Sequence, residues 1–260
     1  MSRVATDWTS GTRAKSAAHH GPLRRAATLA ALVLIVLTVS AWTPEGALAW
    51  ANGDRWGNGF GTHDWVLVEA DRLARDAGCR WLYLRVALPR TDDPDTRLRD
   101  FYHHVYDVWG SRYGDAPQHS EKLYRTAVRQ LKAGKRRAAS VTFALLSHYY
   151  SDICNPLHTD QSRLEERIQS SYEDAVETRT DRRGEHRAWV RADGVRTRTS
   201  AAGAARSAAK WAHRSYGALV REYARRGFTA RVTTITRRCL SRAANDLADL
   251  LLSVQKASRR

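Results

Sequence analysis

The C-terminal segment of the chain repeats apolar residues at every third or fourth position from residue 232 to residue 254. The repeat consists of Val232, Ile235, Cys239, Ala243, Leu247, Leu250 and Val254. This spacing places all of them on one face of an α-helix, whereas a strand would scatter them over both of its faces. The segment therefore predicts a long amphipathic helix whose apolar face must be covered by other parts of the chain.

Four shorter segments have the same helical spacing. They are 66–77, followed by Gly78; 123–131, which stops near Gly134; 136–152; and 162–178. Alternating patterns typical of strands are nearly absent, and 80–88 is the one ambiguous stretch. Residues 180–198 are rich in Arg, Asp and Gly and predict an exposed loop. We therefore expect an all-α protein with a single multi-helix domain over residues 50–260.

The first 49 residues have the features of an export signal. A basic stretch ends at Arg24 and Arg25, an apolar run covers residues 26–42, and Ala47-Leu48-Ala49 has the small-x-small pattern that signal peptidase recognises. These features predict a signal peptide over 1–49, cleaved after Ala49, and a secreted, extracellular protein. The alternative is an uncleaved membrane anchor, although an apolar run of 17 residues is short for a membrane span.

The chain is strongly basic, with 43 Lys and Arg against 27 Asp and Glu and a formal net charge of +16. Such an excess is typical of proteins that meet nucleic acid, an anionic membrane surface or a phosphate-bearing substrate. An arginine-rich genome would produce the same excess without any anionic partner. The three cysteines, Cys79, Cys154 and Cys239, form no Cys-x-x-Cys pair, which argues against a thiolate zinc site.

Histidine and carboxylate residues occur at spacings that suit a metal site. His148 and Asp152 lie four residues apart in a predicted helix, so both side chains project from one face. The other candidates are His158 after Asn155-Pro156, His104 after the acidic cluster Asp92, Asp93 and Asp95, and His63 within Gly61-Thr62-His63-Asp64-Trp65. Each of these is weak alone, because a lone histidine is usually a hydrogen-bonded core residue. Together they predict zinc in a catalytic rather than a structural role.

Four blocks of the sequence resemble bacterial zinc-dependent phospholipase C and the single-strand-specific nucleases of the same superfamily. They are Trp50, which cleavage after Ala49 would make the mature N-terminus; Gly61-Thr62-His63; the acidic cluster followed by His104-Val105-Tyr106-Asp107; and His148-Tyr149-Tyr150-Ser151-Asp152 with Pro156-Leu157-His158. The last block is the most specific. The resemblance covers residues 50–173, and the C-terminal third is similar only in being helical.

The resemblance implies two or three zinc ions bound in a cleft of the helical domain. One ion would be held by Asp92, His104, His148 and Asp152, with Asp93 as the alternative to Asp92. A second would be held by the backbone amino and carbonyl groups of Trp50, by His63, and by Asp152 as a bridge. A third would be held by His158 and Glu173, but Gln169 stands where the family has a further histidine.

The activity implied by the resemblance is hydrolysis of a phosphodiester, most simply a phospholipid head group, by a metal-activated water that Asp92 orients or deprotonates. A nuclease or nucleotidase of the same superfamily is the rival enzyme, with nucleic acid as its substrate. A non-catalytic member that binds anionic membrane surfaces through its arginine-rich helices is the alternative from another class. No protein partner is predicted, and the sequence does not specify the head group.

Overall fold

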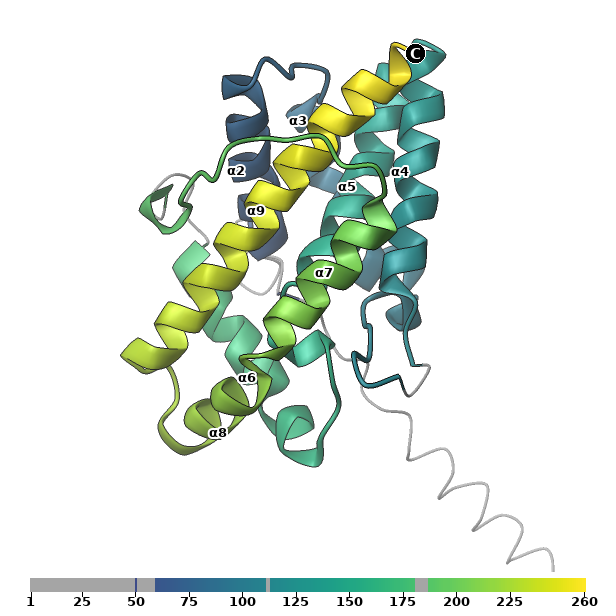
Figure 1. The fold of residues 1–260 in the computed structure, drawn as a ribbon. Coiled ribbons are helices and arrows are strands. Elements are labelled where there is room, and N and C mark those ends of the chain that lie inside the picture. The colour runs from purple at the N-terminus through teal and green to yellow at the C-terminus, as the bar shows by residue number, and fades with distance from the viewer. Residues whose placement is uncertain (1–49, 51–58, 111–112, 181–186) are drawn as a thin grey trace, which may run out of the picture. The chain divides into compact units, whose positions relative to one another are not determined.

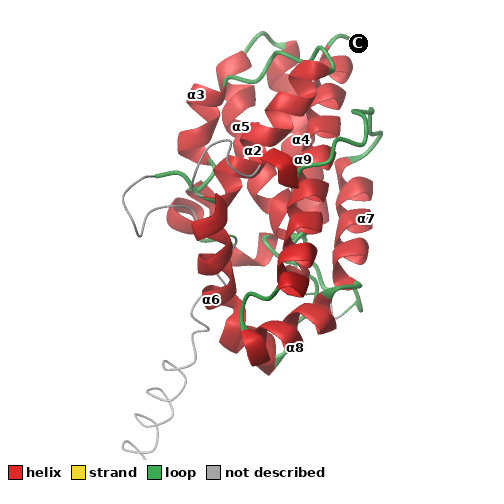
Figure 2. Cartoon of the chain, turned by 90° about the vertical axis from the view of Figure 1, so that its left-hand side faces the viewer, coloured by secondary structure: helices red, strands yellow, loops and turns green. Residues whose placement is uncertain are grey.

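A computed structural model describes residue 50 and residues 59–110, 113–180 and 187–260. The predicted signal peptide, residues 1–49, lies outside this part. The helices are α2 (Thr62–Asp76), α3 (Leu84–Ala87), α4 (Ala116–Lys132), α5 (Arg136–Asp152), α6 (Arg163–Thr180), α7 (Ala201–His213), α8 (Tyr216–Arg226) and α9 (Ala230–Ser258), with short 3-10 and π turns between them (Figure 1). The described residues contain no strand (Figure 2), which confirms the all-α prediction for one multi-helix domain, and the ambiguous stretch 80–88 contains α3. None of the helices described is long and apolar enough to cross a membrane.

Helix α9 is the element around which the others pack. It contacts α2, α4, α5, α7 and α8, and its C-terminal half is buried on nearly every side. Alanine and leucine supply most of the buried surface of 243–254, and its buried polar residues Asn245, Asp246 and Asp249 accept hydrogen bonds from the segment 193–198. The side chain of Thr229 caps its N-terminus by accepting a hydrogen bond from the backbone N–H of Val232. The predicted C-terminal helix is therefore confirmed, and it is the central helix of the domain.

Helices α4 and α5 form an antiparallel hairpin that supports the candidate site. The turn between them contains Gly134 at a φ of 71°, a left-handed conformation that glycine adopts without steric cost. Helix α5 is buried almost continuously from Phe143 to its last residue, Asp152. The hairpin thus fixes the C-terminal end of α5 deep in the domain.

The predicted loop after α6 is ordered where the structure describes it. Residues 191–198, here called the strap, run alongside α9. Their backbone N–H groups at 191, 193, 196 and 198 donate hydrogen bonds to the side chains of Ser241, Asn245, Asp249 and Ser253. These acceptors recur every fourth residue and so lie on one face of α9. Asn245 also donates to the backbone carbonyl of Arg191 at 2.9 Å. The strap therefore satisfies its backbone without a sheet.

Asn245→Ala should loosen the strap, since it removes one acceptor and one donor from the contact with α9. We expect the free energy of unfolding to fall by about 1–3 kcal/mol, the usual cost of leaving buried polar groups unsatisfied. Denaturant unfolding measures this loss, and tryptic cleavage after Arg191 or Arg196 should become faster. Lys256→Ala, at an exposed position of the same helix, is the control. Unchanged cleavage and stability in Asn245→Ala would contradict this account of the strap.

Candidate metal centre

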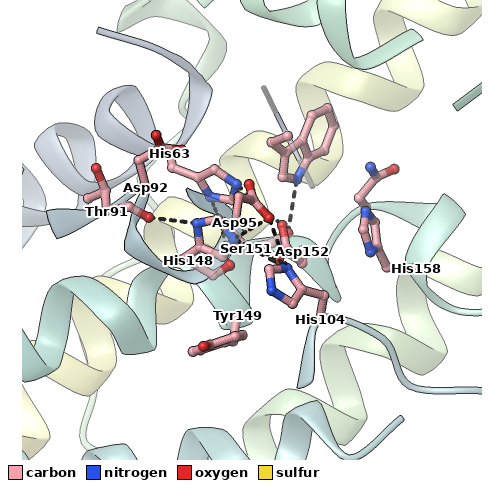
Figure 3. A network of polar contacts seen from close by, with 12 residues as sticks. His63, Thr91, Asp92, Asp95, His104, His148, Tyr149, Ser151, Asp152 and His158 are labelled. Atoms are coloured by element: carbon pink, nitrogen blue, oxygen red, sulfur yellow. Dashed lines mark hydrogen bonds and ion pairs between the residues drawn. The ribbon is translucent and has the colours of Figure 1, made fainter. Parts of the chain in front are cut away.

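The carboxylate of Asp152 lies at the centre of a group of three histidines. Its Oδ1 is 3.4 Å from Nε2 of His63. Its Oδ2 is 2.9 Å from Nδ1 of His104 and 3.4 Å from Nε2 of His148. All four side chains are buried, at 0–1% exposure. Figure 3 shows them converging from the start of α2, the end of α5 and the segment before α4.

A second carboxylate, Asp95, completes a compact set of four donor atoms with His104, His148 and Asp152. Its Oδ1 lies 3.6 Å from Nδ1 of His104 and 3.6 Å from Nε2 of His148 (Figure 3), and those two nitrogens are 3.3 Å apart. Ligands of a tetrahedral zinc ion, at bond lengths of about 2.0–2.1 Å, lie about 3.4 Å from one another. The measured separations match this spacing, so the residues present fit a zinc ion.

Each histidine of the group is held by its second ring nitrogen. Nδ1 of His148 is 2.6 Å from the backbone carbonyl of Thr91, and Nδ1 of His63 is 2.8 Å from the hydroxyl of Ser151. Because the Ser151 hydroxyl donates to the backbone carbonyl of His148, it accepts from His63. In both rings the proton is thus on Nδ1, and Nε2 is left to face the centre. Such outer hydrogen bonds, which fix tautomer and orientation, are characteristic of metal-binding histidines.

A carboxylate also lies behind the opposite nitrogen of His104, at the distance of an ion pair rather than a hydrogen bond. Its Nε2 lies 3.5 Å from Oδ1 of Asp100, and Asp100 in turn accepts a hydrogen bond from the hydroxyl of Tyr149 at 2.8 Å. Nδ1 of His104 therefore faces Asp152 and Asp95. A carboxylate behind a histidine both orients the ring and raises its basicity toward a metal.

The start of α2 is connected to the segment that carries Asp95. The carboxylate of Asp64 accepts from the backbone N–H of Gly61 at 3.2 Å, which closes the first turn of α2 and places His63. Its other oxygen accepts from the hydroxyl of Thr91 at 2.7 Å. Since the carbonyl of Thr91 holds His148, one buried acid fixes two of the three rings indirectly.

His158 and Glu173 form a separate pair beside the four-donor set (Figure 3 shows His158 to one side). Nε2 of His158 is 3.2 Å from Oε1 of Glu173, and the side-chain amide of Gln169 lies 3.4 Å from that nitrogen and 3.2 Å from that oxygen. Asn155 also donates to Glu173. The predicted third set is therefore brought together, with the Gln169 amide in the place where a third ligand would stand.

The remaining predicted residues are close to the site in different ways. Trp50 is buried, and its indole N–H donates to the backbone carbonyl of Ser151 at 3.1 Å, directly before Asp152. Asp92 directly follows Thr91, and its backbone carbonyl accepts from the Thr96 hydroxyl. A carboxylate oxygen of Asp95 also lies within 4.8 Å of a ring nitrogen of both His63 and His148. The role of Asp92 stays a prediction, and Asp95 is a member of the acidic cluster for which no role was predicted.

The alternative acid, Asp93, faces away from the histidines in its contacts. Its carboxylate pairs with Arg90 at 2.6 Å and with Arg97 at 3.5 Å. A carboxylate that is already neutralised by two guanidinium groups is a poor candidate for a metal ligand. Asp93 is better explained as a local ion pair of the turn that carries Asp95.

Burial and the nearby carboxylates act on the histidines in opposite directions. Burial lowers the pKa of His63 well below its usual value, and the charges of His148 and His104 lower it further. Burial would also lower the pKa of His104, but its interactions with the accepting carboxylates of Asp100 and Asp152 outweigh this effect and raise that pKa to about 10. In the metal-free protein, the His104 proton therefore supplies the positive charge that these acids require.

By fold and site, this is an all-helical domain with a buried histidine–carboxylate centre whose donors suit a metal ion. Two solved structures share the fold. The alpha-toxin of Clostridium absonum matches with a TM-score of 0.57 and 15% identity over 78% of this chain and 67% of the toxin. The alpha-toxin of Clostridium perfringens from avian strain SWCP matches with a TM-score of 0.57 and 14% identity, over 80% of this chain and 66% of the toxin.

The chain thus spans about two thirds of the length of each toxin it resembles. At this identity the likeness is one of fold. No protein-family model matches the chain, and no curated protein matches its sequence.

Zinc binding should release a proton at neutral pH. The His104 pKa of about 10 lies above pH 7–9, so the metal-free ring is protonated there and zinc must displace that proton. The apparent affinity for zinc should consequently rise from pH 7 to pH 9. Calorimetry in chelator-buffered zinc, repeated in two buffers of different ionisation enthalpy, measures both quantities. His104→Gln should release fewer protons, and an affinity independent of pH would contradict the assignment.

Proposed function

We propose that this protein is an exported zinc-dependent phosphodiester hydrolase of the phospholipase C type. The observation that supports this most directly is the set of four donors on Asp95, His104, His148 and Asp152, spaced 2.9–3.6 Å apart where pairs are measured. The outer hydrogen bonds of the histidines add to it, because a histidine held only for packing needs no such consistent orientation.

Two likenesses accompany the metal site. The sequence blocks at Trp50, His63, His104 and 148–158 resemble zinc-dependent phospholipase C, and the fold resembles that of clostridial alpha-toxins. The likeness of the short motifs supports the proposed activity, and the likeness of the helices supports the fold. Export through the predicted signal peptide 1–49 is part of the proposal.

The residues have distinct proposed roles. Zinc ions bound here would lower the pKa of a water and neutralise negative charge on a phosphoryl group. His104, His148, Asp152 and one acid of the segment 92–95 would hold the first ion. His63, the mature N-terminus at Trp50 and the second oxygen of Asp152 would hold another. The acid that is not a ligand, Asp92 or Asp95, would orient or accept the proton of the attacking water.

The approach of a substrate is constrained by burial. The histidines and Asp152 are at most 1% exposed, whereas the Asp95 side chain is 8% and the Asp100 side chain 28% exposed. A phosphodiester would therefore reach the centre from the side of residues 95–100. A phospholipid is the proposed substrate, and a single-stranded nucleic acid is the alternative that an activity test separates.

His148→Ala should abolish zinc binding and hydrolysis together, because it removes a ligand that the fold fixes from both ends. The measurements are zinc content by elemental analysis and turnover of a phospholipid and of single-stranded DNA. His213→Ala, which alters a half-buried histidine outside this centre, is the matched control. Full turnover by zinc-free His148→Ala would contradict the proposal, and cleavage of DNA alone would select the nuclease alternative.

The variants Asp92→Asn and Asp95→Asn should show which of the two acids binds zinc and which one acts as the general base. The variant that lacks the general base should keep its zinc, and its rate of hydrolysis should fall about 10²–10⁴-fold. The variant that loses a ligand should lose both zinc and rate. The geometry around Asp95 favours Asp95 as the ligand. Retention of zinc and of activity in both variants would show that neither acid has its proposed role.

A residue added before Trp50 should weaken the second zinc site. If the mature chain begins at Trp50, its free amine is a ligand, and an added residue converts that amine into a peptide N–H with no lone pair to give. We expect the extended chain to contain one zinc ion fewer than the chain that begins at Trp50. Equal zinc content in the two chains would exclude Trp50 as a ligand.

Gln169→His should strengthen the third site. An imidazole is a better zinc ligand than an amide, and the side chain at this position already lies 3.2 Å from Glu173 and 3.4 Å from His158. We expect the variant to gain up to one zinc ion per chain at equal free zinc, with Gln169→Leu as the control for altered packing. If Gln169→His binds no more zinc than the parent, the pair His158–Glu173 is not a metal site.

A second candidate function is binding to an anionic membrane surface without catalysis, and a basic cavity supports it. The cavity measures about 1230 Å³ and its lining includes Arg75, Arg85, Lys135, Arg136 and Arg137. It lies at the start of α5, about 24 Å along that helix from Asp152 at 1.5 Å per residue. A protein with this role alone would show no turnover but would sediment with phosphatidylglycerol vesicles in a salt-dependent way.

A further inference from the structure

A second group of possible ligands lies outside the centre described above. It consists of Asp100, His103 and His119, whose donor atoms lie within 4.8 Å of one another. Asp100 and His103 belong to the segment before α4, and His119 lies in the first turns of α4 itself. All three are half-buried, unlike the fully buried histidines around Asp152. The group is therefore accessible to solvent on one side.

The two histidines of this group are held in place by contacts on either side. Nδ1 of His103 makes a short hydrogen bond to Oδ1 of Asp115, which leaves Nε2 as the nitrogen able to bind a metal ion. The His103 and His119 rings stack with centroids 3.9 Å apart and planes at 19°. Asp115 is the N-cap residue of α4, and the backbone N–H of His119 bonds to its carbonyl. Asp115 thus orients one ring and begins the helix that places the other.

Tyr149 separates this group from the centre around Asp152. Its ring lies 4.6 Å from that of His119 and 5.0 Å from that of His104. Its hydroxyl donates to Asp100, which also lies 3.5 Å from Nε2 of His104. The two groups share no proposed ligand, although Tyr149 and Asp100 each contact both of them. An ion at the second group would therefore be distinct from those at the first.

We propose that Asp100, His103 and His119 form an accessory site for a divalent transition-metal ion. Two imidazoles and one carboxylate suit Zn²⁺, Co²⁺ or Ni²⁺, whereas Mg²⁺ and Ca²⁺ prefer sites made of oxygen atoms. The Asp115–His103 contact reproduces the carboxylate–histidine arrangement found behind metal ligands. Three protein ligands leave at least one coordination position for water or an anion. Because the site is half-exposed, its ion exchanges faster than those bound at the buried centre.

The experiment is a Co²⁺ titration of the mature chain, followed by visible absorption and calorimetry after the tightly bound metal has been measured. His119→Ala is the test variant, because His119 is remote from the Asp152 centre in sequence and touches none of its proposed ligands in any contact described above. His213→Ala is the matched control. The parent and the control should each bind one exchangeable Co²⁺ that His119→Ala does not bind. Equal Co²⁺ stoichiometry in parent and His119→Ala would overturn the site.

Two further measurements keep the result independent of folding and of the proposed hydrolase activity. Far-ultraviolet circular dichroism checks that His119→Ala is folded, and His119→Asn, which keeps a polar side chain, serves as the variant should the alanine variant unfold. His148→Ala should lose the tightly bound zinc yet retain the exchangeable Co²⁺. A parent chain with no tight zinc but with a Co²⁺ that depends on His119 would support the accessory site while the hydrolase proposal fails.

Discussion

The burial of the Asp152 carboxylate is the constraint on which the centre of this protein depends. An isolated carboxylate removed from water costs far more free energy than a domain of this size can offset, so positive charge must accompany it. Three histidines surround it at 2.9–3.4 Å, and two of them are oriented by hydrogen bonds to Thr91 and Ser151. The remaining ring, His104, carries the proton in the metal-free state. A divalent ion replaces that proton with greater charge, which is why the same geometry serves as a metal site.

Helical periodicity made the main features of this centre predictable from the sequence. His148 and Asp152 share a face of α5 because they are four residues apart, and His158 follows in the turn that Asn155-Pro156 begins. The long C-terminal helix was predictable for the same reason. The sequence pattern did not predict the bounds of α7 and α8. Helix α7 is built mainly of alanine, which packs closely but lacks the contrast between large apolar and polar residues that marks a helical face.

The segment between Pro94 and Arg99 shows where such inference ends. It forms a π-helical turn that closes with Arg99 at a positive φ of 51°, so the direction of the Asp95 side chain follows neither α-helix nor strand periodicity. The sequence could identify an acidic cluster there, but only the turn determines that Asp95 approaches His104 and His148. The hydrogen bonds between the strap and α9 could not be predicted either. In the sequence, their acceptors are visible only as the polar face of α9; they are Ser241, Asn245, Asp249 and Ser253.

The pair His158–Glu173 illustrates how one substitution changes the electrostatics of a potential site. Burial raises the pKa of Glu173 to about 7, while the hydrogen bond that it accepts from His158 opposes the shift. Burial also acts to lower the pKa of His158, but Glu173 and Asp152 together outweigh burial and raise that pKa. The two groups can therefore neutralise each other by sharing a proton. The Gln169 amide donates to Glu173 at 3.2 Å and so stabilises its charged form without supplying a second imidazole. Such a pair can be electrically neutral without metal, whereas the four donors around Asp152 contain one more carboxylate than the His104 proton can neutralise. Metal affinity should therefore be concentrated at the Asp152 centre, with His158–Glu173 the weaker site.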